Sequence, residues 1–272
     1  MIDQEFRNQA VPVQLTRESR FCFRCHPGVS CFTDCCRKIN IMLTPYDIIR
    51  IKNRMGISSE EFLAVYTEPK MLEKTGLPVP TLRLLDDEKQ SCPFVRDTEG
   101  CIIYADRPSA CRYYPIGMAT RSHVEEPAAG ESGDDFFFMI NEDRCKGHQE
   151  EQEWTIEEWR RDQGVDLQDK INEGWTELIV RKKSFGMTMD MTEKSRKLFF
   201  MVCYDIDGFK RFVFESDFLK MHDIHADLVE RIRRDEIALL QFGFDWLRAI
   251  LFKLDPEGRF KVKDKEAERR KK

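Results

Sequence analysis

Residues 22–36, CFRCHPGVSCFTDCC, hold five of the ten cysteines of this 272-residue chain, and the last two of the five are adjacent. A hydrophobic core uses cysteine singly, as a small apolar filler, so crowding of this kind needs another cause. Four more cysteines follow before residue 146, and only Cys203 lies beyond them. We therefore expect the N-terminal half to be organised around clustered thiols.

Length and composition describe a globular protein that buries a core without covalent cross-links. Charged residues make up 34% of the chain and hydrophobic residues 41%, as in ordinary folded proteins. The net charge of -5 argues against nucleic acid as a partner, because phosphate binding depends on clustered Lys and Arg. No apolar run is long enough to span a bilayer, so we expect no membrane association.

The first twenty residues are polar and lack the apolar stretch of a secretory signal. We therefore expect a cytoplasmic protein, in which cellular reductants keep thiols reduced. In that compartment a cysteine cluster indicates metal binding or catalysis. A disulfide framework is the alternative, and it would require an export route.

The chemistry of the cluster favours a soft metal. Thiolate sulfur selects zinc or iron–sulfur clusters over magnesium or calcium. The spacings Cys22-x2-Cys25 and Cys31-x3-Cys35 fit the close pairs of structural zinc sites, but the doublet Cys35–Cys36 does not. Adjacent side chains point about 100° apart on a helix, or to opposite faces of a strand. The doublet therefore suits two metal centres, or two irons of one cluster.

Eight thiols are enough for two four-thiolate sites, or for one closed site and one with an open position. None of their spacings matches the bacterial ferredoxin run, which disfavours an ordinary electron-carrying ferredoxin. The candidate metal ligands are Cys25, Cys31, Cys35, Cys36, Cys92, Cys101, Cys111 and Cys145.

Other polar residues lie beside these cysteines. Arg37 and Arg112 each directly follow one, and they are candidate cofactor contacts because positive charge lowers both the cluster charge and the thiol pKa. Ordinary ion pairing is the alternative for both arginines. Imidazole also binds zinc and iron, but we favour loop or supporting roles for His26 and His148. We expect Cys203 in the core.

The pattern of the chain predicts an α+β, predominantly helical fold, with short strands around the N-terminal cysteine site and a helical C-terminal half. Thr44 and Pro45 open a helix that ends at Gly56. CPFV and CIIY form a hairpin, and residues 136–140 pair near 113–118. Residues 205–220 are expected as a loop, and residues 227–252 as one amphipathic helix.

Three regions follow from this pattern. Residues 20–150 form a cysteine-cluster metal-binding domain. Residues 151–258 form a helical region packed on that domain, and residues 259–272 form a basic tail, for which solvation is the simplest interpretation.

The segments FRCHPGVSCFTDCCRKINIMLTPYDIIRIKNRMGIS (residues 23–58), CPFVRDTEGCIIYADRPSACRYYPIG (92–117) and CKGH (145–148) resemble the YkgJ-type cysteine-cluster family, the zinc- or iron-chelating CxxCxxCC domain. The resemblance implies metal chelation by the clustered cysteines. This chain departs from the compact pattern, with five residues between Cys25 and Cys31 and three before the doublet. That departure leaves open whether Cys22 or Cys25 is the first ligand.

The cysteine region is also similar to that of the flagellin lysine N-methylase family, which implies an iron–sulfur cluster. Because this similarity stops at the cysteines, it says little about methyl transfer.

Two functional hypotheses remain. In the first, the protein carries an iron–sulfur cluster, of the four-iron four-sulfide type, and acts in redox chemistry or in cluster-assisted modification of a protein substrate. In the second, zinc folds the N-terminal half and the helical half binds a partner without catalysis.

Overall fold

The structure is a computed structural model that describes residues 13–120, 135–184, 191–256 and 258–260. The chain forms two compact units, and each unit is discontinuous in sequence. Unit 1 comprises Met1–Ile39 and Leu84–Leu167, and unit 2 comprises Asn40–Arg83 and Gln168–Lys272. All eight candidate thiols belong to unit 1. The architecture is α+β and predominantly helical, as the sequence predicts.

Unit 1 is built from short strands and single helical turns. Its antiparallel sheets have two strands each: β1 (Arg20–Cys22) with β8 (Glu153–Thr155), β4 (Val95–Arg96) with β5 (Gly100–Cys101), and β6 (Ile116–Thr120) with β7 (Asp135–Met139). The other elements are the 3-10 turns η2 (Asp34–Cys36), η3 (Tyr104–Asp106) and η4 (Gly147–Gln149), and the helices α4 (Ser109–Tyr113) and α5 (Ile156–Gln163). The predicted hairpin forms at the expected turn, but its strands are two residues long in place of the expected four. The predicted pairing of residues 136–140 near 113–118 is observed as β6 with β7.

A small apolar core holds part of unit 1 together. Phe23, Phe137, Ile156 and Trp159 are buried in it. The Phe23 ring packs edge-on against Trp159, with 5.5 Å between the ring centres. Because Phe23 lies two residues before Cys25, this packing fixes the start of the cysteine segment.

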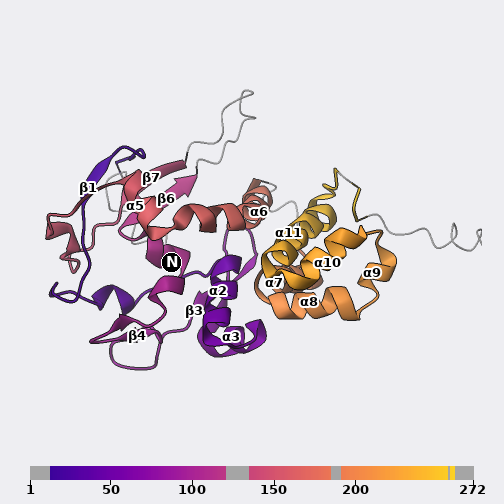
Figure 1. Cartoon of the computed structure of the whole chain (residues 1–272), viewed down its shortest axis with the longest axis horizontal. Helices are drawn as coiled ribbons and strands as arrows, with labels where there is room; N and C mark the ends of the chain where they lie inside the picture. Colours follow the sequence, from indigo (N-terminus) through magenta and orange to yellow (C-terminus); the bar gives the residue numbers. More distant parts are fainter. Residues whose placement is uncertain (1–12, 121–134, 185–190, 257, 261–272) are drawn as a thin grey trace, which may run out of the picture. The chain divides into compact units, whose positions relative to one another are not determined.

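Unit 2 is helical apart from one hairpin, in which β2 (Thr67–Met71) pairs with β3 (Pro78–Leu82). Helix α6 (Val165–Ser184) begins in unit 1 and continues into unit 2. No helix within the described ranges is long and apolar enough to cross a membrane. The remaining helices are α2 (Pro45–Met55), α3 (Ser59–Tyr66), α7 (Glu193–Tyr204), α8 (Ile206–Glu215), α9 (Phe218–Met221), α10 (Ala226–Arg234) and α11 (Glu236–Phe252) (Figure 1).

Local capping sets several of these helix boundaries. The Thr44 hydroxyl accepts a hydrogen bond from the Asp47 N–H, and the Asp47 carboxylate accepts one from the Thr44 N–H. This reciprocal pair satisfies main-chain donors that the first turn of α2 leaves open. Gly56, in the left-handed conformation, ends the helix. Both boundaries agree with the sequence prediction.

Two predictions for the C-terminal half were wrong. The expected loop at 205–220 forms α8 and α9, because its aromatic side chains enter the core: Phe209 and Phe218 are fully buried. The expected single helix at 227–252 is broken at Asp235, whose backbone is extended. The Asp235 carboxylate accepts hydrogen bonds from the N–H groups of Ile237 and Ala238, so it caps α11 rather than continuing α10.

Two predictions about regions of the chain stay predictions. The packing of the helical second half on the cysteine domain concerns the relation between the units and stays a prediction. The basic tail lies outside the described residues from residue 261 onward.

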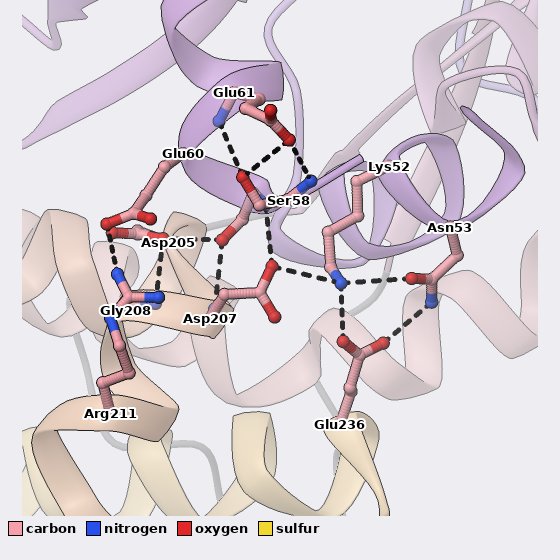
Figure 2. A network of polar contacts seen from close by, with 11 residues as sticks. Lys52, Asn53, Ser58, Glu60, Glu61, Asp205, Asp207, Gly208, Arg211 and Glu236 are labelled. Carbon is pink, nitrogen blue, oxygen red and sulfur yellow. Dashed lines mark hydrogen bonds and ion pairs between the residues drawn. The ribbon is translucent and has the colours of Figure 1, made fainter. Parts of the chain in front are cut away.

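A buried lysine ties four helices of unit 2 together. Figure 2 shows the Lys52 ammonium of α2 between Glu236 of α11 at 2.6 Å and Asp207 of α8 at 3.3 Å. Asp207 also accepts a hydrogen bond from the N–H of Ser59 in α3, at 2.8 Å. The Lys52 side chain is only 6% exposed, whereas each carboxylate is 26% exposed. Its charge is therefore neutralised where water cannot solvate it.

We predict that Lys52→Met destabilises unit 2 by about 3 kcal/mol. The change leaves Asp207 and Glu236 without their cation, and breaking a buried pair costs about 3–5 kcal/mol; their partial exposure favours the lower value. Urea unfolding followed by helical circular dichroism measures the loss. The matched control is Lys197→Met, which removes an exposed pair with Glu193 and leaves the midpoint unchanged. Equal midpoints for the two variants would contradict a structural role for Lys52.

Candidate metal centre

The N-terminal cysteine segment lies against the segment that carries Cys145. The Arg24 N–H donates to the Gly147 carbonyl at 3.1 Å, and the Lys146 N–H donates to the Cys31 sulfur at 3.1 Å. These bonds join residues more than a hundred positions apart in sequence. They bring Cys25, Cys31 and Cys145 into one region of unit 1.

The doublet lies on the 3-10 turn η2. The Cys35 and Cys36 sulfurs are 3.9 Å apart, and both side chains are partly buried. For sulfurs about 2.3 Å from a tetrahedral ion, the edge of the tetrahedron is about 3.8 Å. Both thiols of the doublet therefore stand at a separation that one tetrahedral ion accepts. The tight turn offsets the divergence that adjacent side chains have on a regular helix.

The segment that carries Cys92 and Cys101 also contacts the doublet. The Cys92 N–H donates to the Cys36 carbonyl at 2.8 Å, and Arg37 and Ser91 form an antiparallel bridge. The hairpin β4–β5 then carries Cys101, which pairs with Val95 across the strands. The Phe94 N–H donates to the Cys92 sulfur at 3.4 Å. Main-chain hydrogen bonds thus place Cys92 beside the doublet, and the hairpin links Cys101 to Cys92.

The thiols influence each other's ionisation. Burial, together with the charges of Cys35, Cys31 and Cys145, raises the pKa of Cys25 to about 11. Burial likewise raises the pKa of Cys92 to about 11, with a contribution from Cys101. Cys92 is buried and Cys25 is one of the exposed cysteines, and the anionic forms of both are disfavoured without a compensating cation.

The two thiols of the doublet shift each other's pKa in opposite directions. A hydrogen bond from Cys36 lowers the pKa of Cys35 to about 7, and the positive charge of Arg144 acts in the same direction. The same hydrogen bond, with burial and the charges of Cys92 and Cys111, raises the pKa of Cys36 far above its usual value. Cys35 is therefore the thiol of the pair that ionises first.

The arginines that follow cysteines in sequence have other partners. The Arg37 guanidinium pairs with Asp34 at 2.9 Å and with Asp97 at 2.5 Å. Arg112 donates to main-chain oxygens, among them the carbonyl of Gln163 at 2.8 Å. A direct contact of either arginine with a cofactor stays a prediction.

Sequence reasoning missed Arg144. It donates to the Arg37 carbonyl at 3.2 Å and pairs with Glu142 at 3.1 Å, and its charge acts on Cys35. The sequence offers one indication of a role for Arg144, which is its position immediately before Cys145. Its partner, the doublet, is more than a hundred residues away, so the pattern alone could not identify it.

The two histidines beside the cysteines differ. His26 Nδ1 accepts from the Gly28 N–H at 3.1 Å, so Nε2 carries the ring proton and donates to Glu150 at 3.0 Å. Both nitrogens of His26 are occupied, in agreement with a loop role. Nε2 of His148 is buried and has no hydrogen-bond partner among the described residues, and its ring lies edge-on to Phe23. Of the two, only His148 has a nitrogen available to a metal.

The donor chemistry of the cluster fits a thiolate-bound metal. Hydrogen bonds from the main-chain N–H groups of Lys146 and Phe94 orient the sulfurs of Cys31 and Cys92. All ten cysteines lie in the described residues, and none forms a disulfide. As placed, however, no three Cys, His, Asp or Glu side chains within the described ranges are positioned to hold one ion. The backbone brings the segments together, and ligand geometry would require the sulfurs to approach further.

Two cysteines lie apart from this arrangement. Cys203, on α7 of unit 2, is 1% exposed and packs in the core, as expected. Cys22 is exposed at the end of β1.

Residues 24–146 match the family model CxxCxxCC, which is described as "Putative zinc- or iron-chelating domain". The match includes all eight candidate ligands and excludes Cys22 and Cys203. No curated protein and no solved structure matches the chain.

We predict that Gly100→Ala lowers the affinity for zinc by about tenfold, which corresponds to about 1.4 kcal/mol. Gly100 has a positive φ of 77°, and a Cβ there would lie 2.9 Å from the ring of Phe32, the residue that follows Cys31. The substitution therefore pushes the β4–β5 hairpin away from the cysteine segment. Competition with a chromophoric chelator measures the affinity.

Gly56→Ala is the matched control. Gly56 has nearly the same φ, 68°, but no atom within 4 Å of the added Cβ. Both variants pay the left-handed backbone cost of about 1–2 kcal/mol, and only Gly100→Ala disturbs the cluster. The prediction fails when both variants bind zinc equally.

Proposed function

Because residues 24–146 match the zinc- or iron-chelating CxxCxxCC family, we propose that this protein binds metal through the thiolates of Cys25, Cys31, Cys35, Cys36, Cys92, Cys101, Cys111 and Cys145. The observation that carries the proposal is the convergence of sulfurs from distant segments, held by hydrogen bonds such as Lys146 N–H to Cys31 and Cys92 N–H to the Cys36 carbonyl. A core does not need this arrangement, because it uses cysteine singly, as a small apolar side chain.

The electrostatics of the cluster support a cation as its natural partner. The ionised forms of Cys25 and Cys92 are costly in the metal-free protein, as their pKa values of about 11 indicate. A bound zinc or iron ion supplies positive charge to thiolates and displaces their protons. Arg144 contributes a fixed positive charge at Cys35 and holds the adjacent main chain at Arg37.

An iron–sulfur cluster is the first candidate for the bound group. The number of thiols supports it, as does the similarity of the cysteine region to a family that uses such a cluster. When bound, the cluster would supply electron transfer or substrate activation, as in a redox or protein-modifying enzyme.

Zinc is the second candidate, and one observation favours it. The 3.9 Å between the Cys35 and Cys36 sulfurs is close to the edge of a tetrahedron of thiolates around a single zinc ion, about 3.8 Å. In this case the metal folds unit 1 and has no catalytic role.

The test is elemental analysis of the full chain after anaerobic purification, together with its visible absorption spectrum. Iron with inorganic sulfide and a visible charge-transfer band supports the cluster, and stoichiometric zinc in a colourless protein supports the second candidate. Metal-free protein that also takes up neither metal would contradict the proposed function.

We predict that Cys92→Ser lowers the metal content per chain by half or more, whereas Cys203→Ser leaves it unchanged. Both cysteines are buried, at 8% and 1% exposure, and both changes replace sulfur by oxygen. The pair therefore separates loss of a ligand from general damage to a core. Equal metal content in the two variants would remove Cys92 from the site.

A further inference from the structure

Trp154, at the centre of β8, holds the main chain just before Cys25. Its indole N–H donates to the Phe23 carbonyl at 2.9 Å, and the Phe23 N–H donates to the Gln152 carbonyl at 2.9 Å. Both main-chain groups of Phe23 are therefore bound by residues 152–154. Phe23 lies two residues before Cys25, so these bonds fix the chain from which that thiol projects.

Trp159, on α5, binds the main chain just after Cys111. Its indole N–H donates to the Tyr113 carbonyl at 3.2 Å, in a buried position. Tyr113 ends α4, which has five residues, and the last carbonyls of a helix have no partner within it. A helix of this length is not stable by itself in water. Helix α4 therefore depends on contacts such as this one, and so does the position of Cys111.

The two indoles also connect these segments to each other. They pack edge-on, with 5.4 Å between their ring centres, and Trp159 packs edge-on against Phe23 at 5.5 Å. Cys145 packs against the same apolar core. The segment of Cys25 and the helix of Cys111 are thus held by one aromatic cluster, independently of any contact between sulfurs.

We propose that Trp154 and Trp159 are positioning residues of the metal centre, whose indole N–H groups hold the main chain beside Cys25 and Cys111. Binding is tighter when ligands are held near their bound positions before the metal arrives. This inference rests on the proposed function. It extends the site beyond the family match at residues 24–146, because both tryptophans follow that range.

Replacement of each tryptophan by phenylalanine tests the role of the indole N–H. Trp154→Phe and Trp159→Phe keep an aromatic ring and remove the hydrogen-bond donor. Each is expected to lower the affinity of the full chain for zinc by about tenfold, the lower end of the effect of losing a supporting contact. Competition with a chromophoric chelator measures the affinity.

The other two tryptophans of the chain are matched controls in unit 2. The Trp175 indole N–H donates to the Tyr204 hydroxyl at 2.8 Å, and Trp175 is 6% exposed, against 7% for Trp159. Trp175→Phe therefore loses a buried hydrogen bond of the same kind. Nε1 of Trp246 has no hydrogen-bond partner among the described residues, so Trp246→Phe loses none. Both controls are expected to bind zinc as the unmodified chain does.

The spectrum of bound cobalt separates positioning from a general loss of stability. Cobalt(II) accepts the same ligands as zinc, and its visible bands report the geometry of those ligands. At saturating cobalt, a variant that is only less stable gives the spectrum of the unmodified chain. Trp154→Phe and Trp159→Phe are expected to shift or weaken the bands, because the thiols no longer have their original positions.

Three results would overturn the positioning role and leave the proposed function intact: zinc affinity unchanged in both variants, an equal loss in Trp175→Phe, or an unchanged cobalt spectrum. An unmodified chain that binds neither zinc nor cobalt overturns the proposed function as well. Trp154 is only partly buried, so its variant tests the role even where Trp159→Phe fails to fold.

Discussion

Unit 1 brings cysteines from distant segments into one region on short strands and single helical turns. The hairpin that carries Cys101 has two residues in each strand, and β1 and β8 have three. Isolated two-stranded sheets are marginal in water even when longer. The apolar core around Phe23, Phe137 and Trp159 supports one part of the unit, but the doublet and the hairpin lie outside that cluster. Metal–thiolate bonds would provide the stabilisation that these segments lack.

Unit 2, in contrast, is stabilised by an ordinary hydrophobic core. Its helices bury a continuous set of aromatic and aliphatic side chains, including Phe199, Phe209 and Phe244. One of its buried charged side chains, Lys52, is neutralised by two carboxylates from other helices. The single cysteine of this unit, Cys203, behaves as a small apolar side chain. The contrast explains why cysteines are crowded in one unit and solitary in the other.

Features with a local cause were predictable from the sequence. The start of α2 at Thr44 and the turn between β4 and β5 each depend on residues three or four positions apart. The two errors were local signals that the prediction misread. Ile206, Phe209 and Val213 stand at helical spacing and are buried on α8, a pattern that the loop prediction overlooked. At Asp235, a capping hydrogen bond competed with helix propagation and prevailed.

The same distinction applies to the metal site. Sequence spacing identified the thiols, because their chemistry is visible in the chain, but it could not assign partners across a hundred residues. The doublet shows what sequence spacing cannot predict. Adjacent side chains on a helix or strand diverge, which favours two centres, but the 3-10 turn brings the two sulfurs to 3.9 Å, a distance that one ion also accepts. The doublet alone therefore does not decide the number of centres. The Lys146 N–H donates to the Cys31 sulfur and the Cys92 N–H donates to the Cys36 carbonyl, and no spacing in the sequence pairs these residues.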